Sequence, residues 1–72
     1  MSKKKEENLN NRIRELRARH RLTQEELAQC VDVSRQTIIA IEKGEYNPSV
    51  ALALRIAAVL EVPWQEAFWL TD

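Results

Sequence analysis

The sequence predicts an all-α domain built from five helices. Start signals for two short helices follow each other within residues 22–44, separated by a turn of only a few residues. Residues 50–61 are apolar nearly all round, as in a buried helix. No stretch shows the apolar–polar alternation that is typical of a half-buried strand. A chain of 72 residues suffices for one domain with a small core, which we expect over residues 8–72.

The first helix is expected from about Asn8 to His20. Three apolar residues share one helical face with His20, so we expect this histidine to have a role in the core rather than in catalysis; they are Leu9, Ile13 and Leu16. The preceding residues 1–7, MSKKKEE, are low in hydrophobicity and are predicted to form a disordered tail.

The second and third helices have explicit start and stop signals. Thr23 precedes Glu26 by three residues, the spacing of a capping box, in which hydroxyl and carboxylate each satisfy a backbone N–H. Ser34 is the N-cap of the third helix, and Gly44 supplies a left-handed stop. Hydrophobic staples support both starts, with Leu22 paired to Leu27 and Val33 to Ile38. Because the turn at Asp32-Val33 is short, one of the two helices must project.

The fourth helix is expected from Val50 to about Glu61, with Ser49 as its N-cap. Only Arg55 interrupts its apolar surface, so we expect this helix to be the central buried one. Pro63 starts a short fifth helix, where its missing N–H costs nothing.

Three of the four aromatic residues fall in this fifth helix. Aromatic side chains in so small a domain either complete the core or form an interface. We assign Phe68 to the core, and Trp64, Trp69 and Leu70 to the interface of a homodimer.

The charges are unevenly distributed although the net charge is zero. Residues 1–21 hold eight Lys/Arg and three Glu, whereas residues 22–72 hold three Lys/Arg and eight Asp/Glu. This split predicts a basic surface at one end of the domain, and neutrality overall lowers the affinity expected for nucleic acid of arbitrary sequence. With so little positive charge near the third helix, we expect binding to depend on specific contacts and on the arginines of the first helix, whose outer faces carry Arg12, Arg14, Arg19 and Arg21.

Several kinds of site are not expected. A single cysteine allows no internal disulfide and no zinc cluster, and Cys30, among apolar helix neighbours, is predicted to be a buried or half-buried thiol. No apolar run suggests a signal peptide or a membrane span, so we expect a cytoplasmic protein without a membrane partner. No nucleophile–base pair or carboxylate dyad is evident. We therefore expect no enzyme activity, cofactor, metal or small-molecule ligand.

A helical wheel separates the third helix into two sides. Ile38 and Ile41 fall on the apolar side with Thr37. The outward stripe then consists of Arg35, Gln36, Ile39, Ala40 and Lys43. Arginine can bond guanine and glutamine can bond adenine in the major groove, while a short or apolar side chain meets a thymine methyl group. Ordinary solvated residues on a surface helix are the alternative for Arg35 and Gln36.

Gln24, at the start of the second helix, is placed to meet a phosphate together with the N–H groups of that helix; simple solvation is its alternative. Further candidates for phosphate contacts are Thr23, Ser34, Lys43, Tyr46 and Asn47. Asn47 precedes proline and is equally well explained as a turn residue.

Arg17 and Glu42 are either a buried ion pair or two separate surface charges, and periodicity does not choose between them.

The motifs resemble the Xre/Cro/C1-type, lambda-repressor-like helix-turn-helix regulators. The resemblance runs from about Arg12 to Leu70 and depends on four segments: 22–28 (LTQEELA), 33–38 (VSRQTI), 41–44 (IEKG) and 47–49 (NPS). It implies a compact five-helix DNA-binding domain whose second and third helices form the helix-turn-helix. It also implies base contacts from Arg35, Gln36, Ile39 and Ala40, backbone contacts from Gln24 and Lys43, and an internal ion pair of Arg17 with Glu42.

The sequence departs from the family pattern at three positions. Asp32 stands where glycine is usual, and Asp tolerates the left-handed conformation better than most residues. Ile39 replaces a residue that is often polar, so no base preference can be transferred. Pro63 takes the place of a capping Ser or Thr.

The predicted function is a sequence-specific DNA-binding transcriptional regulator, a repressor that binds a palindromic operator as a homodimer. The alternative is an antitoxin-like or adaptor module whose main partner is another protein, which the acidic residues 22–72 favour.

Overall fold

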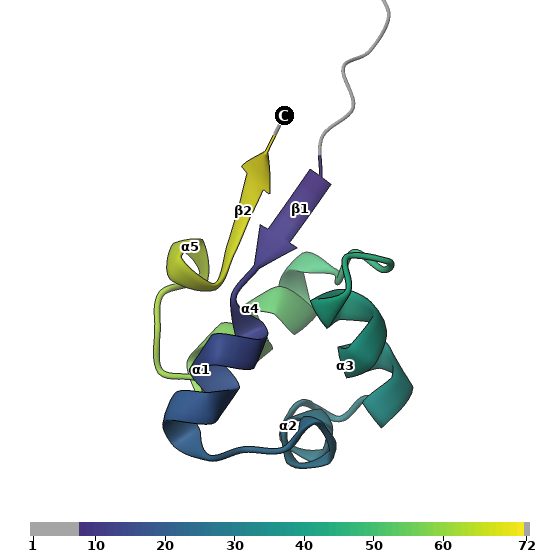
Figure 1. Cartoon of the computed structure of the whole chain (residues 1–72), viewed down its shortest axis with the longest axis vertical. Helices are drawn as coiled ribbons and strands as arrows, with labels where there is room; N and C mark the ends of the chain where they lie inside the picture. The colour runs from purple at the N-terminus through teal and green to yellow at the C-terminus, as the bar shows by residue number, and fades with distance from the viewer. Residues whose placement is uncertain (1–7, 72) are drawn as a thin grey trace, which may run out of the picture.

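The computed structural model describes residues 8–71; the predicted tail, residues 1–7, lies outside the described part. Within these described residues, five helices and two short strands follow one another (Figure 1). In order they are β1 (Asn8–Asn11), α1 (Ile13–His20), α2 (Gln24–Val31), α3 (Arg35–Glu42), α4 (Val50–Val59), α5 (Trp64–Ala67) and β2 (Phe68–Thr71).

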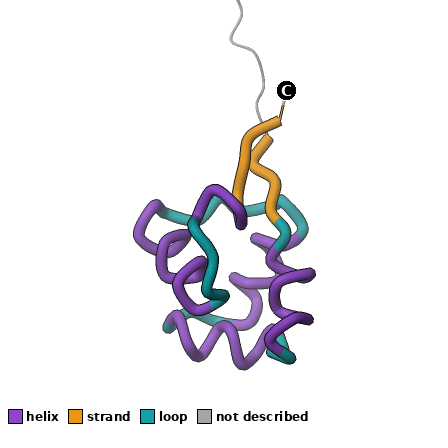
Figure 2. Tube along the Cα trace, turned by 90° about the vertical axis from the view of Figure 1, so that its left-hand side faces the viewer, coloured by secondary structure: helices purple, strands orange, loops and turns teal. Residues whose placement is uncertain are grey.

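A two-stranded antiparallel ribbon joins the two ends of the domain, so the expectation of a strand-free fold is wrong. β1 pairs with β2 in the register Asn8 to Thr71 and Asn11 to Phe68. The ribbon projects from the helical body in both views (Figures 1 and 2). It shortens two predicted helices, because α1 begins at Ile13 rather than Asn8 and α5 ends at Ala67.

Side-chain and backbone hydrogen bonds fix the change from strand to helix. The backbone N–H of Ile13 donates to Asn11 Oδ1 at 3.1 Å, and the Arg12 N–H donates to the carbonyl of Ala67 at 3.1 Å. Asn11 Nδ2 also donates to the carbonyl of Ile41 at 3.0 Å. The base of the ribbon is therefore attached to α5 and to the end of α3.

The core draws on every helix and on β2. Its thirteen buried apolar residues are Ile13, Leu16, Leu27, Ala28, Val31, Ile38, Ile41, Leu52, Ile56, Ala57, Leu60, Ala67 and Phe68. The assignment of Phe68 to the core is confirmed, since its exposed fraction is 3%.

Three expectations about burial are wrong. α4 is not buried all round, because Val50 is 76% and Leu54 47% exposed. Cys30 is exposed, since the buried stripe of α2 runs through Leu27, Ala28 and Val31 and leaves it outside. His20 lies on the predicted face of α1, but at the last residue of that helix it is exposed, with Nε2 2.8 Å from the Leu60 carbonyl oxygen.

Each of the four longer helices is followed, within two residues of its end, by a residue in the left-handed conformation, and three of these residues are not glycine. They are Arg21 (φ 57°), Asp32 (φ 62°), Gly44 (φ 78°) and Glu61 (φ 62°). In each case the N–H of the following residue donates to the carbonyl five positions back, which is the Schellman arrangement; the donors are Leu22, Val33, Glu45 and Val62. Leu22, Val33 and Val62 pack against the core. The predicted left-handed turn at Asp32 and stop at Gly44 are thereby confirmed.

We expect Glu61→Gly to raise the free energy of unfolding by about 0.5–1 kcal/mol. The left-handed conformation costs an L-residue about 1–2 kcal/mol, and the larger entropy loss of glycine on folding offsets about 0.5–1 kcal/mol of that gain. Urea denaturation measures the change. Gly44→Ala is the matched control. It should be destabilising because alanine disfavours the left-handed conformation at φ 78°, and no atom lies within 4 Å of an added Cβ, so a steric clash does not contribute. A loss of stability in both variants would contradict the argument.

Candidate nucleic-acid interface

The starts of α2 and α3 are capped as the sequence predicts. Thr23 Oγ1 accepts from the Glu26 N–H at 3.0 Å, and the Thr23 N–H donates to Glu26 Oε1 at 2.9 Å. Ser34 Oγ accepts from the Thr37 N–H at 3.2 Å. Only three residues, 32–34, separate the two helices. The caps and this short connection set the angle at which α3 leaves α2.

α3 presents one buried and one exposed side. Ile38 and Ile41 are buried in the core. On the outward stripe Arg35, Gln36 and Lys43 are exposed, whereas Ile39 and Ala40 are half-buried. The helix therefore offers two long polar side chains at its start, a cation at its end, and a low apolar surface between them.

A hydrogen-bonded ion pair connects α1 to the end of α3. Arg17 Nε lies 2.7 Å from Glu42 Oε2, and Arg17 Nη2 donates to Glu42 Oε1 at 3.2 Å. The two side chains are 14% and 10% exposed. Arg17 Nη1 also donates to the carbonyl of Leu22 at 3.0 Å. The alternative of two separate surface charges therefore does not apply.

Gln24 joins this pair from α2. Its Nε2 donates to Glu42 Oε1 at 3.2 Å, and the side chain is half-buried rather than free in solvent. Arg17, Glu42 and Gln24 thus form one network, which holds together the three helices around the outward stripe. A network of this kind fixes the position of each side chain better than one contact does.

The family of the chain follows from its sequence. Residues 13–66 match the helix-turn-helix family model HTH_3. The chain belongs to the HTH_3 family of Xre/Cro/C1 type. It is similar to the HTH-type transcriptional regulator YgzD of Bacillus subtilis, with 45% identity over 64 residues that cover 89% of this chain and 97% of YgzD. An HTH-type transcriptional regulator of Methanocaldococcus jannaschii is 50% identical with the same coverage of both chains.

Solved structures agree with the family. The restriction-modification controller protein C.AhdI from Aeromonas hydrophila superposes with a TM-score of 0.70 at 33% identity, covering 75% of this chain and 82% of C.AhdI. The regulator VanUg superposes with a TM-score of 0.78 over 100% of this chain and 96% of its own, and at 19% identity it shows the fold alone. This HTH_3 chain is thus a transcriptional regulator with a helix-turn-helix DNA-binding domain, in a family of regulators rather than enzymes.

Two hollows flank the network on the surface of the HTH_3 domain. The first is lined by Arg14, Arg17, Gln24, Ile39, Glu42 and Lys43. The second is lined by Arg17, Arg21, Leu22, Thr23, Gln24, Glu25 and Arg35. From the sequence, the arginines of the first helix are expected to support binding as a group, without a separate place for Arg14 or Arg21. Their spacing from Arg17, three residues before it and four after it, was the available signal.

The other predicted phosphate contacts lie at the two ends of α3. Thr23 and Ser34 are exposed but already serve as caps. Tyr46 is 50% exposed and Asn47 is exposed, in the loop after Gly44. Ser34 thus precedes the start of α3, and Tyr46 and Asn47 follow its end.

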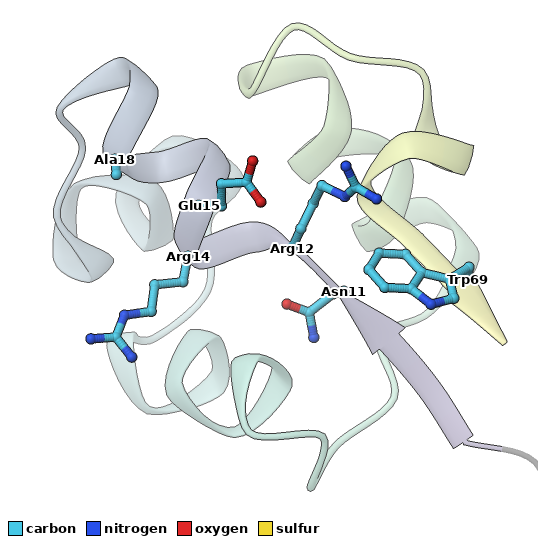
Figure 3. Close-up of a pocket in the computed structure, with 6 residues that line it drawn as sticks. All are labelled: Asn11, Arg12, Arg14, Glu15, Ala18 and Trp69. Atoms are coloured by element: carbon cyan, nitrogen blue, oxygen red, sulfur yellow. The ribbon is translucent and has the colours of Figure 1, made fainter. Parts of the chain in front are cut away.

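The expected dimer residues divide between two faces of the ribbon. Leu70 lies opposite Leu9 in the register, whereas Trp69 lies opposite Asn10, so the two side chains point to different sides. The Cζ atom of Arg12 lies 5.0 Å from the centroid of the Trp69 ring. Figure 3 shows the side chains of Arg12 and Trp69 beside each other. Trp64, 50% exposed, lines an apolar hollow of about 370 Å³ together with Leu9, Pro48, Val50, Ala53, Leu54 and Phe68.

Within residues 8–71, no group of three His, Cys, Asp or Glu side chains is arranged to hold a metal ion. No helix in this part of the HTH_3 chain is long and apolar enough to cross a membrane.

Proposed function

We propose that the protein is a sequence-specific repressor that places α3 in the major groove of its operator. The observation that carries the proposal is the outward stripe of α3. Arg35 and Gln36 stand exposed at the start of the helix, where they can bond guanine and adenine with paired hydrogen bonds. Ile39 and Ala40 supply the low apolar surface that a thymine methyl group contacts. A domain bound in this way blocks access to a promoter.

Phosphate contacts would fix the register of this docking. Gln24 is held beside Glu42 at the start of α2, and Lys43 ends α3. Side chains of this kind donate to phosphate oxygens without reading the sequence. The same role is proposed for Thr23, Ser34, Tyr46 and Asn47.

We further propose that the protein acts as a homodimer through its apolar hollow. Val50, Leu54 and Trp64 are 76%, 47% and 50% exposed, and Leu70, at 60%, adds to the same side of the ribbon. A second copy of the chain offers a matching apolar surface, because a two-fold axis brings the same patch together from both subunits. Trp69 then borders the interface from the other face of the ribbon.

Selection of bound sequences from random DNA tests the function directly. We expect enrichment of a palindrome whose half-sites lie about 34–36 Å apart, one turn of the double helix. Enrichment without a palindrome would exclude the symmetric dimer on DNA. No enrichment, with binding that is insensitive to salt, would instead favour the adaptor or antitoxin-like alternative, because phosphate contacts impose a steep salt dependence.

Arg35→Ala and Gln36→Ala are each expected to weaken binding to the selected operator by about 1–3 kcal/mol. Binding to random DNA should change much less, because base contacts are lost only where the base is correct. Fluorescence anisotropy with both duplexes measures the two affinities. Lys43→Ala is the comparison variant and should weaken both complexes alike. Equal losses on both duplexes in the Arg35 and Gln36 variants would refute base reading.

Leu54→Glu is expected to weaken dimerisation at least about tenfold, because the interface would bury an unpaired carboxylate. Sedimentation equilibrium measures the dimer dissociation constant. Ala51→Glu places the same charge on α4 at an exposed residue that does not line the hollow, and should leave that constant unchanged. Dimerisation that survives Leu54→Glu would move the interface elsewhere.

A further inference from the structure

Three arginines follow one stripe along α1 and its C-cap. Arg14, Arg17 and Arg21 stand at positions i, i+3 and i+7, which share a helical face. The middle one, Arg17, forms the ion pair with Glu42. The outer two are exposed, and neither forms an ion pair with any residue in the described range 8–71. Two exposed arginines therefore stand on either side of one that is fixed.

Each outer arginine borders a different hollow beside α3. Arg14 shares its hollow with Lys43 at the end of α3. Arg21 shares the other with Arg35, the first residue of α3. Arg17 and Gln24 line both hollows, so the network of Arg17, Glu42 and Gln24 separates them. The two hollows thus lie at opposite ends of the helix proposed to read the bases.

Both hollows are positively charged. Three cationic side chains and a single carboxylate line each one. In the first hollow this carboxylate is Glu42, which is already paired with Arg17. In the second it is Glu25, in the first turn of α2. An anion at either place would meet an excess of positive charge and, in Arg14 or Arg21, an exposed guanidinium that can form paired hydrogen bonds.

We propose that Arg14 and Arg21 bind two phosphates of the DNA backbone, one at each end of α3. This inference depends on the proposed docking of α3 in the major groove, which brings the backbone on both sides of that groove toward the two hollows. It gives two arginines of α1 and its C-cap, which lie outside the helix-turn-helix, separate places on the backbone. It also explains how a chain of zero net charge can bind the backbone, because the basic residues needed there come from α1.

The remaining arginines of the same region are engaged elsewhere. Arg12 stacks over Trp69, and Arg19 Nη2 lies 2.7 Å from Glu15 Oε2, on a part of α1 that lines neither of these hollows. Arg19→Ala therefore removes the same charge from the same helix at a place where no phosphate is expected. It is the matched control for the experiment below.

The test compares Arg14→Ala, Arg21→Gly and Arg19→Ala on labelled DNA duplexes of random sequence and on the selected operator. Arg21→Gly also relieves the left-handed conformation at φ 57°, so its domain should be more stable to urea while it binds DNA less well. We expect each of the first two variants to lose affinity about tenfold on both duplexes. The slope of log K against log salt should become shallower by about 0.9 in each. Arg19→Ala should change neither quantity.

If Arg14→Ala and Arg21→Gly bind DNA as Arg19→Ala does, with unchanged salt slopes, the inference is overturned. The proposed function then remains intact. Failure of the wild-type protein to bind either duplex would overturn both. A loss confined to the operator would also contradict the inference, because it would make these arginines base-reading residues.

Discussion

Phe68→Ala is expected to lower the free energy of unfolding by about 3–5 kcal/mol, because it leaves a cavity in the core. The side chain is 3% exposed and stands where α5 ends and β2 begins. The loss is comparable with the whole stability of a domain of this size, roughly 4–11 kcal/mol. Urea denaturation followed by far-UV circular dichroism measures it, and the variant is expected to be largely unfolded near physiological temperature.

Trp69→Ala is the control for this variant. Trp69 is the next residue of β2, but it points to the other face of the ribbon and is 37% exposed. Removal of its contact with Arg12 costs about 0.5–1 kcal/mol at such an exposed site. A loss for Trp69→Ala as large as that for Phe68→Ala would contradict the alternation of the two side chains, and with it the strand at this end of the chain.

The helix-turn-helix could be predicted because its signals are local. The capping box of Thr23 and Glu26, the cap at Ser34 and the left-handed stop at Gly44 each involve residues no more than a few positions apart. Such contacts form wherever the backbone turns in the right way, whatever surrounds them. The angle between α2 and α3, and hence the outward stripe, follows from them.

The ribbon could not be predicted in the same way. β1 holds one apolar residue, Leu9, among three asparagines, and β2 begins with three consecutive apolar residues, so neither shows a period of two. Its hydrogen bonds pair residues about sixty positions apart. Leu9 and Phe68 also fit a helical pattern. The tertiary pairing of the two chain ends makes these segments strands instead of helices.

One part of the candidate site could be predicted from local patterns, and another part could not. Periodicity within α3 sufficed to place Arg35 and Gln36 on its outer side. The spacing of Arg14 and Arg21 from Arg17 puts all three on one face of α1, but the hollow that each outer arginine borders depends on how α1 packs against α2 and α3, which no local pattern encodes. Periodicity likewise left Arg17 and Glu42 undecided, because an ion pair is a distance between two helices.

Arg17→Met is expected to lower the free energy of unfolding by about 3 kcal/mol. The substitution leaves the Glu42 carboxylate 10% exposed without its counter-charge, and breaking a buried pair from one side is costly because the remaining charge stays desolvated. Gln24 Nε2 would be its sole side-chain hydrogen-bond partner within residues 8–71. A fall in melting temperature of roughly 4–8 °C per kcal/mol is expected for a domain of this size, and calorimetry measures it.

The double variant Arg17→Met with Glu42→Met separates the ion pair from the rest of the network. Replacing both charges with apolar groups removes the desolvated carboxylate, so most of the stability lost in Arg17→Met should return. The two substitutions should therefore be far from additive, with a coupling of about 2 kcal/mol. DNA binding should not recover in parallel, because Gln24 loses the Glu42 oxygen that holds it at the start of α2. Additive losses of stability would show that the pair contributes nothing beyond the packing of its two side chains.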